Sequence, residues 1–98
     1  LQIAYDVSNA EFVGEDQPDA IRRAGKRIGQ FHLSDGTRTQ WRHDCIGLGT
    51  VRFHEILNAI KDAEISASPI LEIISSSPLE DLAASAGALK QHATDYPN

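Results

Sequence analysis

The stretch GQFHLSD at residues 29–35 decides the fold prediction. A short apolar, strand-like run carries His32 near its carboxyl end and then passes into a polar loop. A polar side chain inside an apolar strand loses hydration, and its burial costs free energy unless it has partners. The position of His32 therefore needs a structural or chemical reason.

Two other runs repeat this arrangement, one before it and one after it. The run IAYD at residues 3–6 ends on Asp6, and the run ILEII at residues 70–74 contains Glu72. Two carboxylates and an imidazole are usual ligands of a divalent metal ion. Active groups of parallel α/β folds gather at the carboxyl ends of the strands. We therefore expect Asp6, His32 and Glu72 to lie together at that edge.

Each run is followed by a loop and a helical pattern, so the sequence predicts three strands and three helices in alternation. The expected strands cover residues 2–7, 29–33 and 69–74. Alternation of this kind favours parallel strands joined by right-handed crossovers. The predicted fold class is α/β, built from parallel (β/α) units. Three such units, at about 30 residues each, are too few to close a (β/α)8 barrel.

Capping residues mark where the three helices are expected to begin. Asp16 is expected to cap the first helix, after a loop at residues 8–16, and Thr50 is expected to cap the second. The sequence SPLE at residues 77–80 is a capping box with proline at the first helical position. The buried side of this third helix is expected to carry Leu79, Leu82, Ala83, Ala86 and Leu89.

The composition limits the classes of function. The net charge of −5 and the pI near 5.2 disfavour a general binder of nucleic-acid phosphates, so no nucleic-acid partner is expected. No apolar run approaches membrane-spanning length, so no membrane partner is expected. The single cysteine, Cys45, cannot form an internal disulfide and favours a cytoplasmic location.

Several segments of the chain match a known family in their order and spacing. They are YDVSN at residues 5–9, FHLSD at 31–35, RHDCIGLG at 42–49, VRF at 51–53 and ILE at 70–72. In these segments the chain resembles the xylose isomerase-like and AP endonuclease family 2 barrels, which include sugar phosphate isomerases and epimerases. The resemblance implies one domain over residues 1–98 that forms the C-terminal part of a TIM (β/α)8 barrel.

The resemblance also implies a metal site. Asp6, His32 and Glu72 match the family's ligands after strands six, seven and eight, and the ion would be Mn²⁺, Mg²⁺ or Zn²⁺. A fourth family ligand, a Glu after strand five, has no counterpart because the chain starts after that position. Glu72 would serve both as a ligand and as a catalytic acid/base group.

Three further residues match positions that contact substrate or a further metal ion in the family. Many members carry His where this chain has Asn9, a difference that disfavours a three-metal phosphodiesterase site. His43 matches a second-metal His of the endonucleases, and Arg42 lies beside it, at a position near a substrate-binding Arg of some epimerases. Asn9, Arg42 and His43 are therefore expected to bind substrate.

Each candidate ligand also has a purely structural interpretation. Asp6 can cap a loop through nearby backbone amides. His32 can be a core histidine bonded to a backbone carbonyl, and Glu72 can pair with Arg42 or Arg38. In the polar loop expected at residues 34–49, Trp41 can cover a sugar ring or anchor the loop.

Two enzyme classes and one non-catalytic class follow from these features. The first is a sugar or sugar phosphate isomerase or epimerase that moves a proton through an enediolate. The alternatives are an AP endonuclease-like phosphodiesterase and a partial barrel without catalytic activity. Because three strands leave two open edges, we expect a missing N-terminal segment or self-association to complete the fold, and we expect the chain alone to be inactive.

Overall fold

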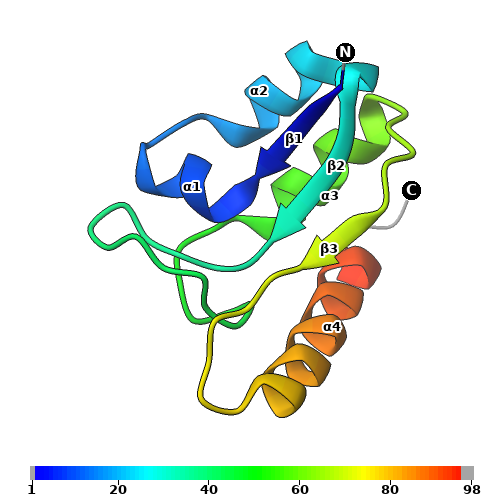
Figure 1. Cartoon of the computed structure of the whole chain (residues 1–98). Helices are drawn as coiled ribbons and strands as arrows, with labels where there is room; N and C mark the ends of the chain where they lie inside the picture. Colours follow the sequence, from blue (N-terminus) through cyan, green and yellow to red (C-terminus); the bar gives the residue numbers. More distant parts are fainter. Residues whose placement is uncertain (1, 96–98) are drawn as a thin grey trace.

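Three parallel strands, in chain order across the sheet, form the centre of the structure (Figure 1). They are β1 (Ile3–Asp6), β2 (Ile28–Leu33) and β3 (Pro69–Leu71). The structure is a computed structural model and describes residues 2–95. Asp6 is in register with His32, and His32 with Ile70, so the carboxyl ends of the strands share one edge. The predicted parallel α/β arrangement is confirmed.

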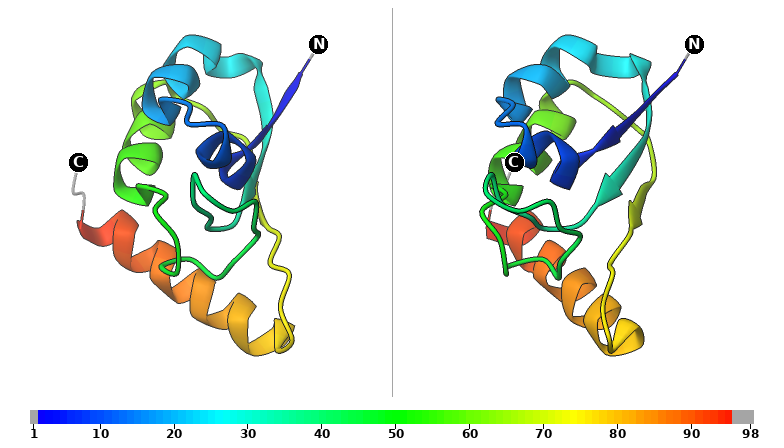
Figure 2. Two further views of the ribbon diagram at one scale, coloured as in Figure 1. Left: turned by 90° about the vertical axis from the view of Figure 1, so that its left-hand side faces the viewer. Right: turned by 60° about the vertical axis from the view of Figure 1, so that its left-hand side comes forward.

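Helices follow each strand and lie on one side of the sheet (Figure 2). They are α1 (Val7–Phe12), α2 (Gln17–Ala24), the 3₁₀ helix η1 (Gly25–Arg27), α3 (Phe53–Asp62) and α4 (Pro78–Asp95). Helices α2 and α3 pack against each other, and α3 also contacts α4. Within residues 2–95, no helix has the length and apolar character needed to cross a membrane.

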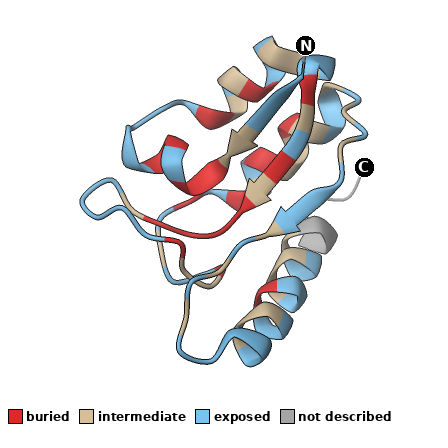
Figure 3. Ribbon diagram, in the orientation of Figure 1, coloured by how far each residue is buried: buried red, intermediate tan, exposed pale blue. Residues whose placement is uncertain are grey.

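The core lies between the sheet and the helices. Along β2, Phe31 and Leu33 are buried, whereas Gln30 is exposed and His32 is half-buried (Figure 3). Side chains of a strand alternate between its two faces, so one face of β2 packs against the helices and the other carries polar groups. From the helix side, Ile21 meets this core and is fully buried.

Helix α1 occupies part of the segment predicted as a loop at residues 8–16, so that prediction is wrong. Asp6 is the N-cap of α1, and its side chain accepts a hydrogen bond from the backbone N–H of Asn9. Val7 and Ala10 lie on the buried side of α1. A helix of 6 residues has too few turns to produce a periodic apolar pattern, which is why the sequence did not indicate it.

The expected Thr50 cap is also wrong. Helix α3 begins after Arg52, which makes no capping hydrogen bond through its side chain. The Thr50 hydroxyl instead donates to Glu11 Oε2 at 2.6 Å. Glu11 is 8% exposed and also accepts a hydrogen bond from Gln17. The Thr50 hydroxyl therefore binds this carboxylate and does not cap α3.

The third unit differs from its prediction in two places. The segment after β3 leaves the sheet at Glu72, because Ile74 donates its backbone N–H to the carbonyl of His43 in the loop rather than to β2. Along α4, Leu79 is 84% exposed, whereas Ser85 is buried, and its hydroxyl accepts from the backbone N–H of Ile46 at 3.1 Å. Ala83 and Ala86 are exposed, while Leu82 and Leu89 are partly buried as expected.

Candidate metal centre

Asp6, His32 and Glu72 come together at the carboxyl edge of the sheet. Each offers one ligand atom, and these atoms all lie within 4.8 Å of one another. Asp6 ends β1, His32 lies near the end of β2, and Glu72 follows β3. The backbone N–H of Glu72 donates to the carbonyl of Leu33 at 3.0 Å, which fixes its height beside β2. The expected convergence is present, and the role of these residues as ligands remains a prediction.

His32 is held by an oxygen acceptor on each side of its ring. Nε2 lies 2.9 Å from Gln30 Oε1, and Nδ1 contacts Glu72 Oε2 directly. Metal-binding histidines usually donate the other ring N–H to an oxygen atom, which sets the tautomer and the ring orientation. With Nε2–H directed to Gln30, Nδ1 would exchange its contact with Glu72 for coordination of an ion that both residues hold. Gln30 can be found in the sequence because it precedes His32 by one strand repeat.

The Asp6 carboxylate is oriented through one of its two oxygens. Oδ1 accepts hydrogen bonds from the Asn9 backbone N–H at 3.0 Å and from Ser8 Oγ at 3.1 Å. The capping interpretation of Asp6 is therefore correct in this respect. Since both bonds are made by Oδ1, capping is compatible with coordination through Oδ2.

Glu72 does not pair with either arginine that the structural alternative proposed. Its side chain is 51% exposed and contacts His32. Arg42 instead pairs with Asp44, with 2.6 Å between Nε and Oδ2, and this contact raises the pKa of the Arg42 guanidinium. The donor set of two carboxylates and an imidazole fits Mn²⁺, Mg²⁺ or Zn²⁺.

The three predicted substrate-binding residues lie in or beside the loop between β2 and α3, and all of them are bonded to other protein groups. Asn9 Oδ1 accepts from Trp41 Nε1 at 2.6 Å, and Arg42 points to Asp44. His43 is 8% exposed and meets Trp41 edge-on, with ring centroids 4.8 Å apart. Trp41 thus anchors the loop, and it remains 57% exposed, so its ring can also contact a ligand.

A family model described as the xylose isomerase-like TIM barrel matches residues 1–92. The chain belongs to this family. A solved structure titled "Structure of L-ribulose 3-epimerase" is also similar, with a TM-score of 0.70 and 17% sequence identity. The similarity covers 96% of this chain and 38% of that structure's chain. No curated protein gives a significant match.

The sequence did not predict the structural role of one buried residue, Asp35. Asp35 is 1% exposed and accepts hydrogen bonds from three backbone N–H groups. They belong to Gly36, Gly47 and Val51, at 2.9, 2.8 and 3.1 Å. Asp35 therefore fixes the base of the β2–α3 loop. Its place in the matched segment FHLSD was the available signal, but the sequence did not indicate which amides it would meet.

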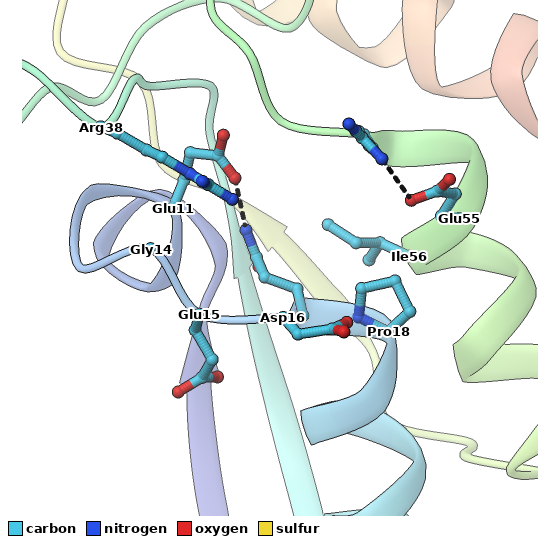
Figure 4. Close-up of a pocket in the computed structure, with 10 residues that line it drawn as sticks. Glu11, Gly14, Glu15, Asp16, Pro18, Arg38, Glu55 and Ile56 are labelled. Atoms are coloured by element: carbon cyan, nitrogen blue, oxygen red, sulfur yellow. Dashed lines mark hydrogen bonds and ion pairs between the residues drawn. The ribbon is translucent and has the colours of Figure 1, made fainter.

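A hollow of about 280 Å³ lies near the start of α2, and none of the three candidate ligands lines it (Figure 4). Three of the charged side chains that line it have partners within the protein. Glu11 accepts from Gln17 at 3.1 Å, and Arg52 lies 3.7 Å from Glu55. The strand ends therefore remain the place where ligand groups converge.

Proposed function

We propose that the chain is part of a divalent-metal-dependent isomerase or epimerase that acts on a sugar or sugar phosphate. The observation that carries this proposal is the convergence of Asp6, His32 and Glu72 within 4.8 Å at the strand ends. Membership of the xylose isomerase-like family and the similarity to a structure titled L-ribulose 3-epimerase support it. Since the chain spans 38% of that structure, the activity is assigned to a protein that contains the rest of the barrel.

Asp6, His32 and Glu72 would hold the ion in this proposal. A bound divalent ion supplies polarisation of a substrate carbonyl and of the neighbouring hydroxyl. The Glu72 carboxylate removes or returns the proton on the carbon beside that carbonyl. Its 51% exposure leaves it accessible to a substrate. A complete exchange through an enediolate needs a second acid/base group, which the family resemblance places on strand five of the barrel.

The phosphodiesterase alternative is less well supported by these residues. Cleavage of a DNA backbone benefits from several metal ions and from a basic binding surface. The chain has a net charge of −5, and it carries Asn9 where many members carry an additional His. Both features favour a small-molecule substrate over DNA.

Solvent-deuterium incorporation tests the proposed reaction. A longer protein that contains this segment, supplied with Mn²⁺, Mg²⁺ or Zn²⁺, is incubated in D₂O with a panel of keto-sugars and their phosphates. We expect exchange at the carbon beside the carbonyl of at least one sugar. Glu72→Gln should lower the rate 10²- to 10⁴-fold, because it removes an acid/base group and keeps the side-chain shape.

Glu55→Gln is the matched control, because Glu55 is an exposed glutamate on α3 outside the site. It should leave the exchange rate unchanged. Absence of exchange with every sugar, together with metal-dependent nicking of abasic DNA, would replace this proposal by the phosphodiesterase. Absence of both activities would favour a non-catalytic barrel.

A further inference from the structure

A buried chain of polar groups leads from the β2–α3 loop to Asp6. Ser8 and Ser34 are each 1% exposed, and His43 is 8% exposed. His43 Nδ1 lies 3.0 Å from both serine hydroxyls, and Ser34 Oγ lies 2.9 Å from Ser8 Oγ. Ser8 Oγ in turn lies 3.1 Å from Asp6 Oδ1. Buried polar groups of this kind are kept only when their hydrogen bonds are satisfied.

The direction of each hydrogen bond follows from counting protons. An ionised carboxylate only accepts, so the Ser8 hydroxyl donates to Asp6 Oδ1. Ser8 Oγ can then accept from Ser34, which uses the Ser34 proton. His43 Nδ1 must therefore be a donor if all of these contacts are made together. Each hydrogen bond of this series then donates in the direction of Asp6, and His43 carries its hydrogen on Nδ1.

A second path leads from the same loop to the same oxygen atom. Trp41 Nε1 donates to Asn9 Oδ1 at 2.6 Å, and the Asn9 backbone N–H donates to Asp6 Oδ1 at 3.0 Å. Trp41 and His43 contact each other edge-on, so the two paths begin at neighbouring side chains. The loop and the Asp6 carboxylate are thus joined twice, with α1 between them.

We propose that Ser8, Ser34 and His43 are positioning residues that orient Asp6 for an ion and link the conformation of the loop at residues 41–43 to ion binding. This inference rests on the ligand role assigned to Asp6 above. It goes beyond that role because His43 acts by orienting Asp6 and not by contacting the substrate. Linkage is reciprocal, so binding of an ion stabilises the loop, and an ordered loop tightens ion binding.

Zn²⁺ titration of the 98-residue chain tests the link, with calorimetry for affinity and Trp41 fluorescence for the loop. Trp41 is the single tryptophan, so the emission reports this loop alone. Ser8→Ala should weaken Zn²⁺ binding 10- to 100-fold, the usual loss when a group that orients a ligand is removed. The change in Trp41 emission on adding Zn²⁺ should also shrink.

Ser85→Ala is the matched control. Ser85 is buried like Ser8 and bonds to the same loop through Ile46, but it is not connected to Asp6. It should leave the Zn²⁺ affinity unchanged. Equal weakening by both variants would overturn the proposal, as would Zn²⁺ binding that leaves Trp41 emission constant. Unchanged affinity in Ser8→Ala would overturn the positioning role and leave the metal site standing, whereas absence of Zn²⁺ binding in the unmodified chain would remove both.

A second measurement on the unmodified chain needs neither metal nor a variant. Long-range ¹H–¹⁵N correlation spectra distinguish the two tautomers of a histidine ring. We expect His43 to carry its proton on Nδ1. A spectrum that places the proton on Nε2 would contradict the hydrogen-bond directions on which the positioning role depends.

Discussion

The second and third βα units of the chain are packed very differently. Phe31 on β2 and Phe53 on α3 are each 1% exposed, and Ile56 is buried beside them. In β3, Pro69 and Ile70 are exposed, and the only buried side chain among those described in α4 is Ser85. Two of the three candidate ligands lie in these regions: His32 is on the tightly packed second unit, and Glu72 follows β3 in the more exposed third unit. Glu72 is therefore the candidate ligand whose position depends least on the core.

The largest effect expected from this contrast is on folding stability. Phe31→Ala should lower the free energy of unfolding by about 3–5 kcal/mol, because a large buried side chain leaves a cavity. Leu79→Ala, at a side chain that is 84% exposed, should change it by less than about 0.5 kcal/mol. Urea denaturation followed by circular dichroism measures both. Similar losses in the two variants would mean that the third unit is packed as tightly as the second.

Binding of an ion should reduce the difference in local stability between the second and third βα units. Zn²⁺ at about 100 times its dissociation constant adds about 2.7 kcal/mol to the stability of a one-site protein. Because Glu72 is the ligand on the open unit, hydrogen exchange should slow more in β3 and α4 than in β2 and α3. Mass spectrometry of exchanged peptides reports this, with His32→Gln as the variant that should lose the effect. Uniform slowing across the chain would contradict the expectation that an ion stabilises the third unit most, through Glu72.

A smaller effect is expected where the third unit does make a buried contact. Ser85→Ala leaves the Ile46 backbone N–H without its partner, and an unsatisfied buried donor costs about 1–3 kcal/mol. Ser76→Ala, an exposed serine in the turn before α4, is the control and should have no measurable effect. The midpoint of thermal unfolding distinguishes them. An unchanged midpoint in Ser85→Ala would show that α4 contributes little to stability through this bond.

The smallest effect concerns pH and lies in the first unit. Burial, and next the hydrogen bond to Glu15, raise the pKa of Tyr5 above its ordinary value of 10.0. The unfolded state therefore ionises first as the pH rises, so this contribution to stability is complete below about pH 10 and declines above it. Urea midpoints at pH 9 and pH 11 should differ more in the unmodified chain than in Tyr5→Phe. Equal differences would assign the alkaline destabilisation to other groups.

The sequence predicted the strands and the candidate site because both depend on local signals. Apolar runs identified the strands, and a polar residue near the end of each run identified Asp6, His32 and Glu72. The parallel α/β fold then requires these strand ends to meet at one edge. The family and the fold are confirmed, and the roles of the site residues remain predictions.

The features that the sequence did not predict depend on contacts between distant segments. The buried face of α4 is set by Ile46 in a loop far along the chain, so the apolar stripe through Leu79 was misleading. Thr50 resembles a cap, but the buried carboxylate of Glu11 competes for its hydroxyl. In both cases the deciding partner is about 40 residues away, a separation at which local propensity carries no information.

The closed base of the β2–α3 loop, to which Asp35 belongs, also determines which residues of that loop can change. Asp35 and Asp44 exchange two backbone hydrogen bonds of 2.8 and 2.9 Å, and a Cβ atom on Gly49 would lie 2.3 Å from the Gly36 carbonyl oxygen. These contacts close the base of the loop, while the exposed tip at residues 38–40 extends beyond it. Insertions and substitutions at the tip can therefore accumulate without disturbing the scaffold below. The closed base therefore allows the tip to vary in length and sequence while the strand ends that carry the candidate ligands keep their positions.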